Sequence, residues 1–424
     1  MFVLIFVILV LLAHFYLWLR LVRHTTGPGR LRKALTWGLV GLLAVLVTTF
    51  AGTRMGLESW LAWPGFVWLA VMFYLVMILA VLEIPRAVAG VFLRRAGRRD
   101  RASATAHRER APEPVPVLAG TGAHEQIASP EQVAPSGPAA AAADATAMSR
   151  RLFLGRTTAA IAGVSALGTV GYGMTSALGD PLIERVTIAL PKLDPRLSGL
   201  RFAVVSDIHL GPLTGIGHTE RIVRMINGLE ADVVAIVGDL VDGTVAQLGA
   251  LARPLKSLES RYGAFFVTGN HEYFTPEGPG EWVEELGQLG VRSLRNERVE
   301  ISHQGAVLDL AGVNDVGGAP TGDGPDFVKA LGDRDTSRSA VLLAHQPIQV
   351  EEAARHGVDL QLSGHTHGGQ IAPFNLVVGM QQPVVSGLAT IDGVQVYVTR
   401  GAGFWGPPVR VGAPPEITML ELRS

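Results

Sequence analysis

The segment FAVVSDIHLG, residues 202–211, joins a run of small and apolar residues to a short polar turn. Its first half has the composition of a buried β-strand, and Asp207 and His209 follow where that strand would end. The same order recurs in VVAIVGDLVDG, residues 233–243, where Asp239 follows the apolar run. In open α/β sheets, ligand sites form beyond the carboxyl ends of the strands. We therefore expect these side chains to meet at one edge of a sheet.

Three later segments repeat this arrangement. They are AFFVTGNHEY, VLLAHQP and LQLSGHTHGG, whose polar residues are Asn270 and His271, then His345, then His365 and His367. A single Asp or His after a strand is usually a turn or structural residue, whereas five such strand ends favour one converging site. Helical stretches such as TERIVRMINGL lie between the apolar runs and predict βαβ units around a buried sheet.

The ligand types narrow the chemistry of such a site. The chain has no cysteine, so a metal would be held by carboxylate, imidazole and amide groups. This donor set suits Mn, Fe or Zn. The candidates are too many for one catalytic ion, which needs roughly three protein ligands and an open position. Two ions ~3.5–4 Å apart that share a carboxylate would use them all, and this arrangement serves in-line displacement at phosphorus.

The motifs DIH, GDLVD, GNHE, AHQP and GHTHGGQ, in this order, resemble the calcineurin-like metallophosphoesterase superfamily. They are most similar to its membrane-associated or twin-arginine-exported bacterial phosphodiesterase branch. The resemblance spans about residues 185–422 and rests on five ordered motifs. It implies an α/β fold in which two mixed β-sheets pack face to face with helices outside, an αββα sandwich.

The resemblance also implies a role for each motif residue. On one metal ion it places Asp207, His209 and His367. On the second it places Asn270, His345 and His365, with Asp239 bridging the two ions. The catalytic residue would be His271, a non-ligand acid that protonates the leaving oxygen. The two divalent ions (Mn, Zn or Fe) would lower the pKa of a bridging water, so that hydroxide attacks phosphorus in line.

These features predict a membrane-bound, dinuclear-metal-dependent phosphohydrolase. Its substrate would be a phosphoester, and we expect a phosphodiesterase or pyrophosphatase acting on a lipid or cell-envelope compound, because helices hold the site near the bilayer. Two alternatives stay open. One is a phosphomonoesterase acting on phosphoproteins or nucleotides, and the other is a non-catalytic membrane sensor with a metal-binding domain. The intact His271 favours catalysis, since a sensor needs no acid beside its metals.

The stretch VTRGAGFWGPPVR supplies weaker candidates. Arg400 and Gly401 follow an apolar run and are candidate substrate-contacting residues, while Phe404 and Trp405 would form either an apolar rim or part of the core. Asp242 and Glu272 would orient ligands rather than bind metal. The remaining histidines of this half are expected at the surface: His218, His303 and His356.

The totals indicate membrane content. Charged residues make up 17% of the chain, below the ~25% of ordinary soluble domains, and the mean hydropathy is +0.31. Residues 1–85 contain three uncharged stretches long enough to span a bilayer, at 1–19, 34–53 and 59–82. A signal peptide is excluded for the first because no basic region precedes it. The net charge of −1 gives no expectation of nucleic-acid binding.

The region between the spans and the motifs has two parts. Residues 86–148 are basic and then rich in Ala and Pro, which predicts a disordered linker. Residues 149–179 hold a twin-arginine-like motif followed by an uncharged stretch, interpreted either as a fourth transmembrane helix or as a cleaved export signal. Arginines flank the first and third spans, so the positive-inside rule and either interpretation place the catalytic domain, 180–424, outside the cytoplasm. We expect a multi-pass protein of the cell membrane.

Overall fold

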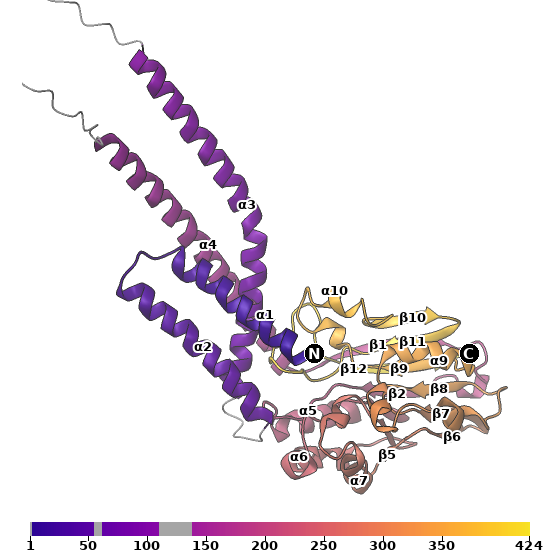
Figure 1. Cartoon of the computed structure of the whole chain (residues 1–424). Coiled ribbons are helices and arrows are strands. Elements are labelled where there is room, and N and C mark those ends of the chain that lie inside the picture. Colours follow the sequence, from indigo (N-terminus) through magenta and orange to yellow (C-terminus); the bar gives the residue numbers. More distant parts are fainter. Residues whose placement is uncertain (1, 55–61, 110–137) are drawn as a thin grey trace, which may run out of the picture. The chain divides into compact units, whose positions relative to one another are not determined.

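The computed structural model describes residues 2–54, 62–109 and 138–424 (Figure 1). By their contacts, the residues form two compact units. The first comprises Met1–Gly41 and Met72–Leu167, and the second comprises Leu42–Val71 and Gly168–Ser424. Every strand of the described chain belongs to the second unit, which also holds all the motif residues.

Within the described residues, four helices are long and apolar enough to cross a membrane. The elements are α1 (Phe2–Leu17) with a π-helix at Trp18–Arg23, α2 (Arg30–Arg54), α3 (Ala62–Glu109) and α4 (Pro138–Leu178). Their candidate spans are Leu4–Arg23, Arg30–Thr53, Ala62–Pro85 and Leu152–Leu178. Three overlap the predicted spans and the fourth overlaps the twin-arginine-like segment. The predicted start of the third span, at residues 59–61, lies outside the described residues.

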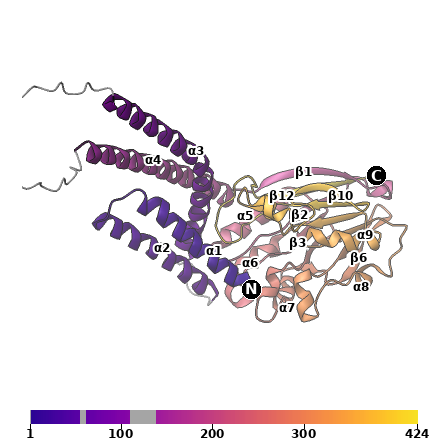
Figure 2. The same ribbon diagram turned by 45° about the horizontal axis from the view of Figure 1, so that its top comes forward.

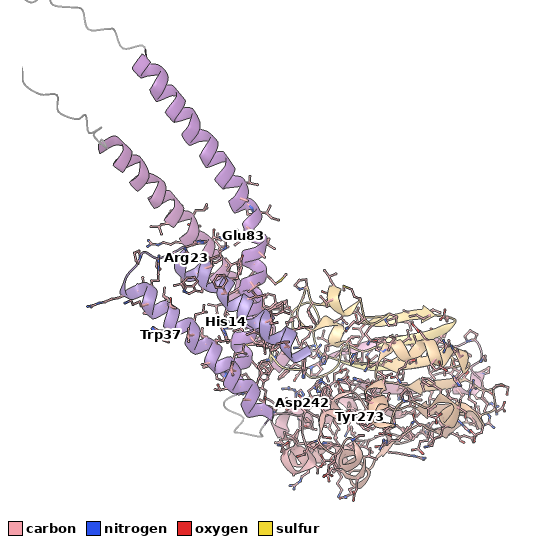
Figure 3. All side chains as sticks on the ribbon, in the orientation of Figure 1. His14, Arg23, Trp37, Glu83, Asp242 and Tyr273 are labelled. Carbon is pink, nitrogen blue, oxygen red and sulfur yellow. The ribbon has the colours of Figure 1, made fainter. Side chains whose placement is uncertain are left out.

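An ion pair joins the ends of two of these spans. Arg20, in the π-helix, pairs with Glu83 of α3, which Figure 3 labels, and the Tyr16 hydroxyl donates a hydrogen bond to Glu83 at 3.4 Å. The sequence does not reveal this partner of Tyr16, because Glu83 is distant along the chain. Pairing lowers the cost of placing both charges near hydrocarbon.

The structure differs from the predicted linker over 86–148. Helix α3 continues to Glu109 and α4 begins at Pro138, so residues 86–109 and 138–148 are helical. Low apolar content predicts the absence of a packed core, but Ala and Arg are strong helix formers and extend a helix already nucleated by a membrane span. The central part of the predicted linker, residues 110–137, lies outside the described residues.

The second unit contains two six-stranded mixed sheets, visible side by side in Figures 1 and 2. In spatial order the first sheet holds β1 (Leu182–Ala189), β12 (Glu416–Arg423), β2 (Arg201–Val205), β3 (Val233–Val237), β4 (Ala264–Val267) and β5 (Val291–Ser293). The second holds β10 (Gly387–Ile391), β11 (Val394–Val398), β9 (Leu360–Ser363), β8 (Ala340–Leu343), β7 (Ala306–Gly312) and β6 (Glu297–His303). The motif strands β2, β3 and β4 run parallel, as do β8 and β9.

Helices cover the outer face of each sheet, and apolar side chains fill the space between the sheets. Against the first sheet pack α5 (Ile216–Asn227), α6 (Val245–Ala252) and α7 (Gly280–Gln288). Against the second pack α8 (Phe327–Leu331) and α9 (Val350–Arg355), while α10 (Asn375–Val378) precedes β10. Short 3₁₀ helices occur at Pro195–Leu197, Arg253–Ser257, His271–Phe274, Val316–Thr321, Pro347–Gln349 and His367–Gly369. The predicted αββα sandwich is confirmed.

Strand register sets where the motif residues lie. Val205 of β2 is paired with Ile236 of β3, and Val237 of β3 is paired with Val267 of β4. The three strands therefore end at nearly the same level. The turns that follow β2 and β3 also contact each other, because the Asp207 amide donates a hydrogen bond to the Gly238 carbonyl at 3.1 Å. In the second sheet the Gly364 amide donates to the His345 carbonyl at 3.0 Å, which aligns the ends of β8 and β9.

Candidate metal centre

Five of the seven predicted metal ligands occupy turns with left-handed backbone conformation. Their φ angles are 51° at Asp207, 49° at His209, 51° at Asp239, 70° at His365 and 52° at His367. Asp and His tolerate this region better than most residues, yet each such position costs about 1–3 kcal/mol. Strain of this kind persists only where the surrounding fold fixes it, so the strand ends hold these side chains in defined directions.

The first cluster joins the turns after β2 and β9. Ligand atoms of Asp207, His209 and His367 all lie within 4.8 Å of one another, and the three residues are buried. The Nε2 atom of His367 is 3.1 Å from Nε2 of His209 and 3.3 Å from Oδ1 of Asp207. Two imidazole nitrogens and a carboxylate oxygen converging in this way match a divalent-metal donor set.

The second cluster joins the turns after β3, β8 and β9. Ligand atoms of Asp239, His345 and His365 again lie within 4.8 Å of one another. The Nδ1 of His345 lies 2.7 Å from the Val237 carbonyl, to which it donates, and its Nε2 lies 3.1 Å from Oδ2 of Asp239. A backbone carbonyl that fixes one ring nitrogen and leaves the other free is the usual support of a metal-binding histidine.

Asp239 lies between the two clusters. Its Oδ2 atom is 3.1 Å from Nε2 of His345 and 3.9 Å from Nε2 of His209. Its other oxygen, Oδ1, accepts the backbone amide of His271 at 2.9 Å, which fixes the carboxylate plane. One carboxylate therefore faces the histidines of both clusters.

Three of the proposed ligands carry a buried side-chain atom that lacks a hydrogen-bond partner among the described residues, although Nε2 of His345 lies in ion-pair range of Oδ2 of Asp239. The three atoms are Oδ1 of Asn270, Nε2 of His345 and Nδ1 of His365. An unsatisfied buried polar atom costs about 1–3 kcal/mol, so three together demand an explanation. His345 and His365 belong to the second cluster, and Asn270 precedes His271, whose amide binds Asp239. The types of the three atoms suit a divalent metal.

The pKa shifts of three cluster residues suit metal binding, whereas burial raises the pKa of Asp207, and Asp239 outweighs burial to raise that of His345. Burial, with the positive charge of Arg410, holds the pKa of His367 well below its ordinary value. Burial and the nearby His345 lower the pKa of His365 to about 3. Burial opposes ionisation of Asp239, but His345 and His271 outweigh it and keep the pKa of this carboxyl well below normal. Neutral imidazole and ionised carboxylate are the forms that bind metals.

Asp242, labelled in Figure 3, connects the first cluster to the predicted acid. Its Oδ1 lies 2.8 Å from Nδ1 of His209 and 2.7 Å from Nδ1 of His271, and it accepts from both. Each ring therefore turns its Nε2 toward Asp239. Burial lowers the pKa of His271, but the charges of Asp239 and Asp242 outweigh burial and raise this pKa to about 9. In the metal-free site this pKa favours the imidazolium form at neutral pH.

Glu272 acts on the backbone of the site. The residue is completely buried, and its carboxylate accepts the amides of Gly269 at 2.6 Å, Leu240 at 2.8 Å and Asp239 at 3.1 Å. It thereby ties the turn after β4 to the turn after β3. Neither oxygen faces a ligand cluster in these contacts, consistent with the orienting role expected from the sequence.

Two exposed aromatic rings border His271. The Phe274 ring centroid lies 4.8 Å from that of His271, and the Trp405 centroid lies 5.7 Å from it. Phe274 is 71% exposed and Trp405 is 53% exposed, whereas Phe404 is buried. Of the two aromatic residues in GFWG, only Trp405 therefore belongs to the rim of the site.

The two weaker substrate candidates separate in the structure. The guanidinium of Arg400 pairs with Glu416 at 2.5 Å and Glu184 at 3.5 Å, so its charge is already matched within the first sheet. This arrangement argues against Arg400 as a free phosphate ligand. Gly401 does lie at the site, because a Cβ there would come within 2.6 Å of the Asp207 Cβ. Its lack of a side chain allows the two turns to approach.

Two further residues of the site, Asp315 and Arg410, are not among the candidates predicted from the sequence. Asp315 follows β7 and is buried, and its Oδ1 accepts from the Gln346 side chain at 3.0 Å, beside His345. Asp315 repeats the sequence pattern of an acid after an apolar run, and this pattern is sufficient to make it a candidate site residue. Arg410 is also buried and donates to the carbonyl oxygens of His367, Arg400 and Gly403. No sequence pattern marks it.

The histidines expected at the surface are not all exposed. His218 is buried, with Nε2 3.3 Å from the Ile208 carbonyl, because α5 packs its inner face on the first sheet. His303 is buried too and lies 2.8 Å from the Tyr262 hydroxyl. His356 is half-buried. None of the three belongs to the clusters found among the described residues.

The part of the chain that contains both clusters is similar to known proteins. The family model described as calcineurin-like phosphoesterase matches residues 200–369. A zebrafish (Danio rerio) protein named transmembrane protein with metallophosphoesterase domain is 39% identical over 262 residues, covering 60% of each chain. The chain thus spans 60% of the length of that relative.

Bacterial relatives are matched over more of their length. A Helicobacter pylori protein named an uncharacterized metallophosphoesterase is 40% identical over 262 residues, which cover 60% of this chain and 68% of the relative. An Aquifex aeolicus protein of the same name is 34% identical over 246 residues, covering 57% of this chain and 92% of the relative.

Proposed function

This chain belongs to the calcineurin-like metallophosphoesterases, and on that premise we propose that it is a membrane-bound phosphohydrolase that uses two divalent metal ions. The catalytic domain would be the part of the second unit near residues 180–424, and the apolar helices would anchor it. The observation that carries this proposal is the set of buried ligand atoms without a partner at Asn270, His345 and His365. A bound cation would satisfy these atoms, and two of the three residues belong to a cluster of converging ligand groups.

We assign the seven ligands to two ions that share Asp239. Asp207, His209 and His367 would hold the first ion, and Asn270, His345 and His365 the second. When bound, such ions supply a nucleophilic hydroxide and neutralise the charge that develops on phosphate oxygens. The shared position of Asp239 is supported by its contacts of 3.1 Å with His345 and 3.9 Å with His209.

His271 would serve as the general acid. It belongs to neither cluster assigned to an ion, although it forms a third group of possible ligands with His209 and Asp242. Its Nε2 faces Asp239, and its Nδ1 is held by Asp242. Because its pKa is raised to about 9, the ring carries at neutral pH the proton that a leaving alkoxide needs. Asp242 would keep that proton on the correct ring.

The substrate we propose is a phosphodiester or pyrophosphate of a lipid or cell-envelope compound. Membrane helices keep the site close to a bilayer, and Phe274 and Trp405 place apolar surface beside the proposed acid. A leaving group with apolar character would contact those rings as it departs. The arginines that flank the apolar helices support a multi-pass topology with the catalytic domain outside the cytoplasm.

Turnover by the full chain in detergent tests the proposal. Aryl phosphodiesters, aryl phosphomonoesters and lipid pyrophosphates would be offered with Mn, Zn or Fe, alongside His271→Ala and the matched variant His356→Ala, which alters a half-buried histidine outside the clusters. We expect diester or pyrophosphate hydrolysis that falls by about 10²–10⁴ in His271→Ala only. Monoester hydrolysis alone would indicate a phosphomonoesterase, and metal binding without turnover would indicate a sensor.

A further inference from the structure

An uncharged, apolar segment is exposed in the second unit. From Gly368 to Ile391 the sequence contains no Asp, Glu, Lys or Arg. Around α10, four apolar side chains are between 46% and 81% exposed: Phe374, Leu376, Val377 and Met380. We call these four residues the α10 patch; α10 lies next to β10 in Figure 1. Grouped exposed apolar residues on a soluble fold mark a contact surface.

The α10 patch is connected to the end of a candidate membrane span through a short series of backbone contacts. The Arg410 amide donates to the Gly173 carbonyl of α4 at 2.9 Å. The next residue, Val411, accepts from the Ala372 amide at 2.9 Å. Ala372 precedes Phe374 by only two positions, so the patch begins beside the chain that touches α4. All of these residues belong to the second unit.

Gly173 lies within the last part of the span. It precedes the final helical residue, Leu178, by five positions, which at 1.5 Å per residue is about 8 Å of helix. A side chain at 173 would approach Val409 to 2.5 Å, so glycine lets the 409–411 chain lie directly on the helix. The headgroup and upper acyl region occupies about this depth, 5–10 Å, for interfacial helices. The contact therefore brings the base of the patch to the membrane surface.

Aromatic residues of the kind found at bilayer interfaces accompany the patch. Tyr172, next to Gly173 on α4, is 66% exposed, and Trp405 is 53% exposed. The backbone amide of Trp405 donates to the Gln370 side chain at 3.0 Å, and that side chain donates back to the Trp405 carbonyl at 2.9 Å. Tyr and Trp favour the headgroup level of membranes. Trp405 thus links the segment bearing the patch to the rim beside His271.

We propose that the α10 patch docks onto the surface of the bilayer crossed by α4, with its apolar side chains at the level of the lipid headgroups. The absence of charge removes the desolvation penalty that would oppose insertion, and the contact with Gly173 sets the depth. Docking would hold the rim formed by Phe274 and Trp405 against the lipid phase. It rests on the membrane position of α4 and requires no hydrolytic activity, so its failure is distinguishable from failure of the proposed function.

Single-cysteine labelling of the full chain tests the docking directly, because the chain contains no cysteine. Met380→Cys would carry an environment-sensitive fluorophore in vesicles of neutral and anionic phospholipid. The matched control is Val328→Cys, also an apolar position and 70% exposed, on α8. Quenchers would be lipids with a nitroxide near the headgroup and, in the aqueous phase, iodide. Both positions are at least 70% exposed, so neither cysteine removes packed core.

We expect the lipid quencher to act several-fold more strongly at position 380 than at 328, with iodide showing the reverse. Adding Leu376→Glu to the Met380→Cys protein should weaken the lipid quenching, because a charge disfavours the interface. Iodide access equal at both positions, with no lipid quenching, would overturn the proposal. Protection of position 380 from both quenchers would also overturn it, since the patch would then be covered by protein, such as a second copy of the chain.

Discussion

Nδ1 of His271 lies 2.7 Å from Oδ1 of Asp242, the same oxygen that accepts from His209. One carboxylate thus fixes the orientation of both the proposed acid and a proposed metal ligand. Its charge, with that of Asp239, raises the pKa of His271 to about 9 against the opposing effect of burial.

Asp242→Asn keeps an oxygen acceptor for His271 and removes the charge. In the metal-free site the folded pKa of His271 is raised, so the protonated acid is present below about 9 and is lost as the pH rises through that value. Cations bound at Asp239 would lower this pKa in the wild type and the variant alike. In the variant this loss should begin at lower pH, by about one unit or more. The pH dependence of kcat, measured at saturating metal, reports the shift.

The variant Asp180→Asn is a suitable comparison, because Asp180 is an exposed residue paired with Arg221. At alkaline pH, the kcat of this variant should fall over the same pH range as that of the wild type. If Asp242→Asn also leaves the alkaline limb in place and changes only the metal concentration needed for activity, Asp242 acts through His209 alone.

Replacing Asp239 and replacing His271 should have different effects on metal content and activity. Asp239→Ala removes the carboxylate that faces the histidines of both clusters, so the purified protein should lose bound metal as well as activity. His271→Ala removes no proposed ligand, so it should retain metal and lose about 10²–10⁴ of its rate. Elemental analysis with parallel rate measurement separates the two. An Asp239→Ala protein with full metal content and full rate would contradict the ligand assignment.

Removal of metal should lower the stability of the second unit. Three buried ligand atoms have no partner among the described residues, and a bound cation stabilises only the folded chain. At a hundredfold excess of metal over Kd the gain is about 2.7 kcal/mol. For a unit of this size that is roughly 5–10 °C in Tm, at 2–4 °C per kcal/mol. Thermal melts with and without a chelator measure this difference.

The comparison variant for the melts is His365→Ala. It removes one of the three unpartnered atoms, Nδ1 of His365, and so weakens the site without disturbing the β-sandwich core. The chelator should then change its Tm by less than in the wild type. Equal chelator effects in both proteins would show that His365 does not contribute to metal binding.

The sequence predicts that the strand ends meet because parallel strands bring their carboxyl ends to one edge of a sheet, whereas the αββα fold is predicted by the resemblance to the family. The roles of the individual residues at that edge stay predictions. Asp315 follows β7 in the same pattern as Asp207 after β2, yet a single acid after a strand is weak evidence by itself. The resemblance to a family gives no motif that contains it.

Other features depend on contacts between distant parts of the chain. Arg400 follows β11 and resembles a phosphate ligand in the sequence, but its partner Glu416 becomes apparent only when β12 is in place. Arg410 is buried among backbone carbonyl groups, an environment that composition cannot reveal. Low hydrophobicity likewise predicts that residues 86–109 lack a core, whereas local helix propensity extends α3 through them.

His218 provides a prediction for the acid stability of the second unit. Burial, with the charge of Arg221, lowers its pKa to about 4, against 6.5 in an unfolded chain. Between these values the unfolded chain binds a proton that the folded chain does not. The unfolding free energy should therefore fall as the pH drops from about 6.5 to 4, by up to about 3 kcal/mol from this one residue.

Replacing His218 by Gln removes the titrating ring and retains a side-chain amide able to donate to the Ile208 carbonyl. The variant should lose part of the acid destabilisation, so its denaturant midpoint should depend less steeply on pH between 6.5 and 4. Measurements in the presence of a chelator at both ends of that range keep metal loss from contributing. If the denaturant midpoints of the two proteins depend equally on pH, His218 becomes protonated in the folded chain, and α5 shifts to accommodate the charge.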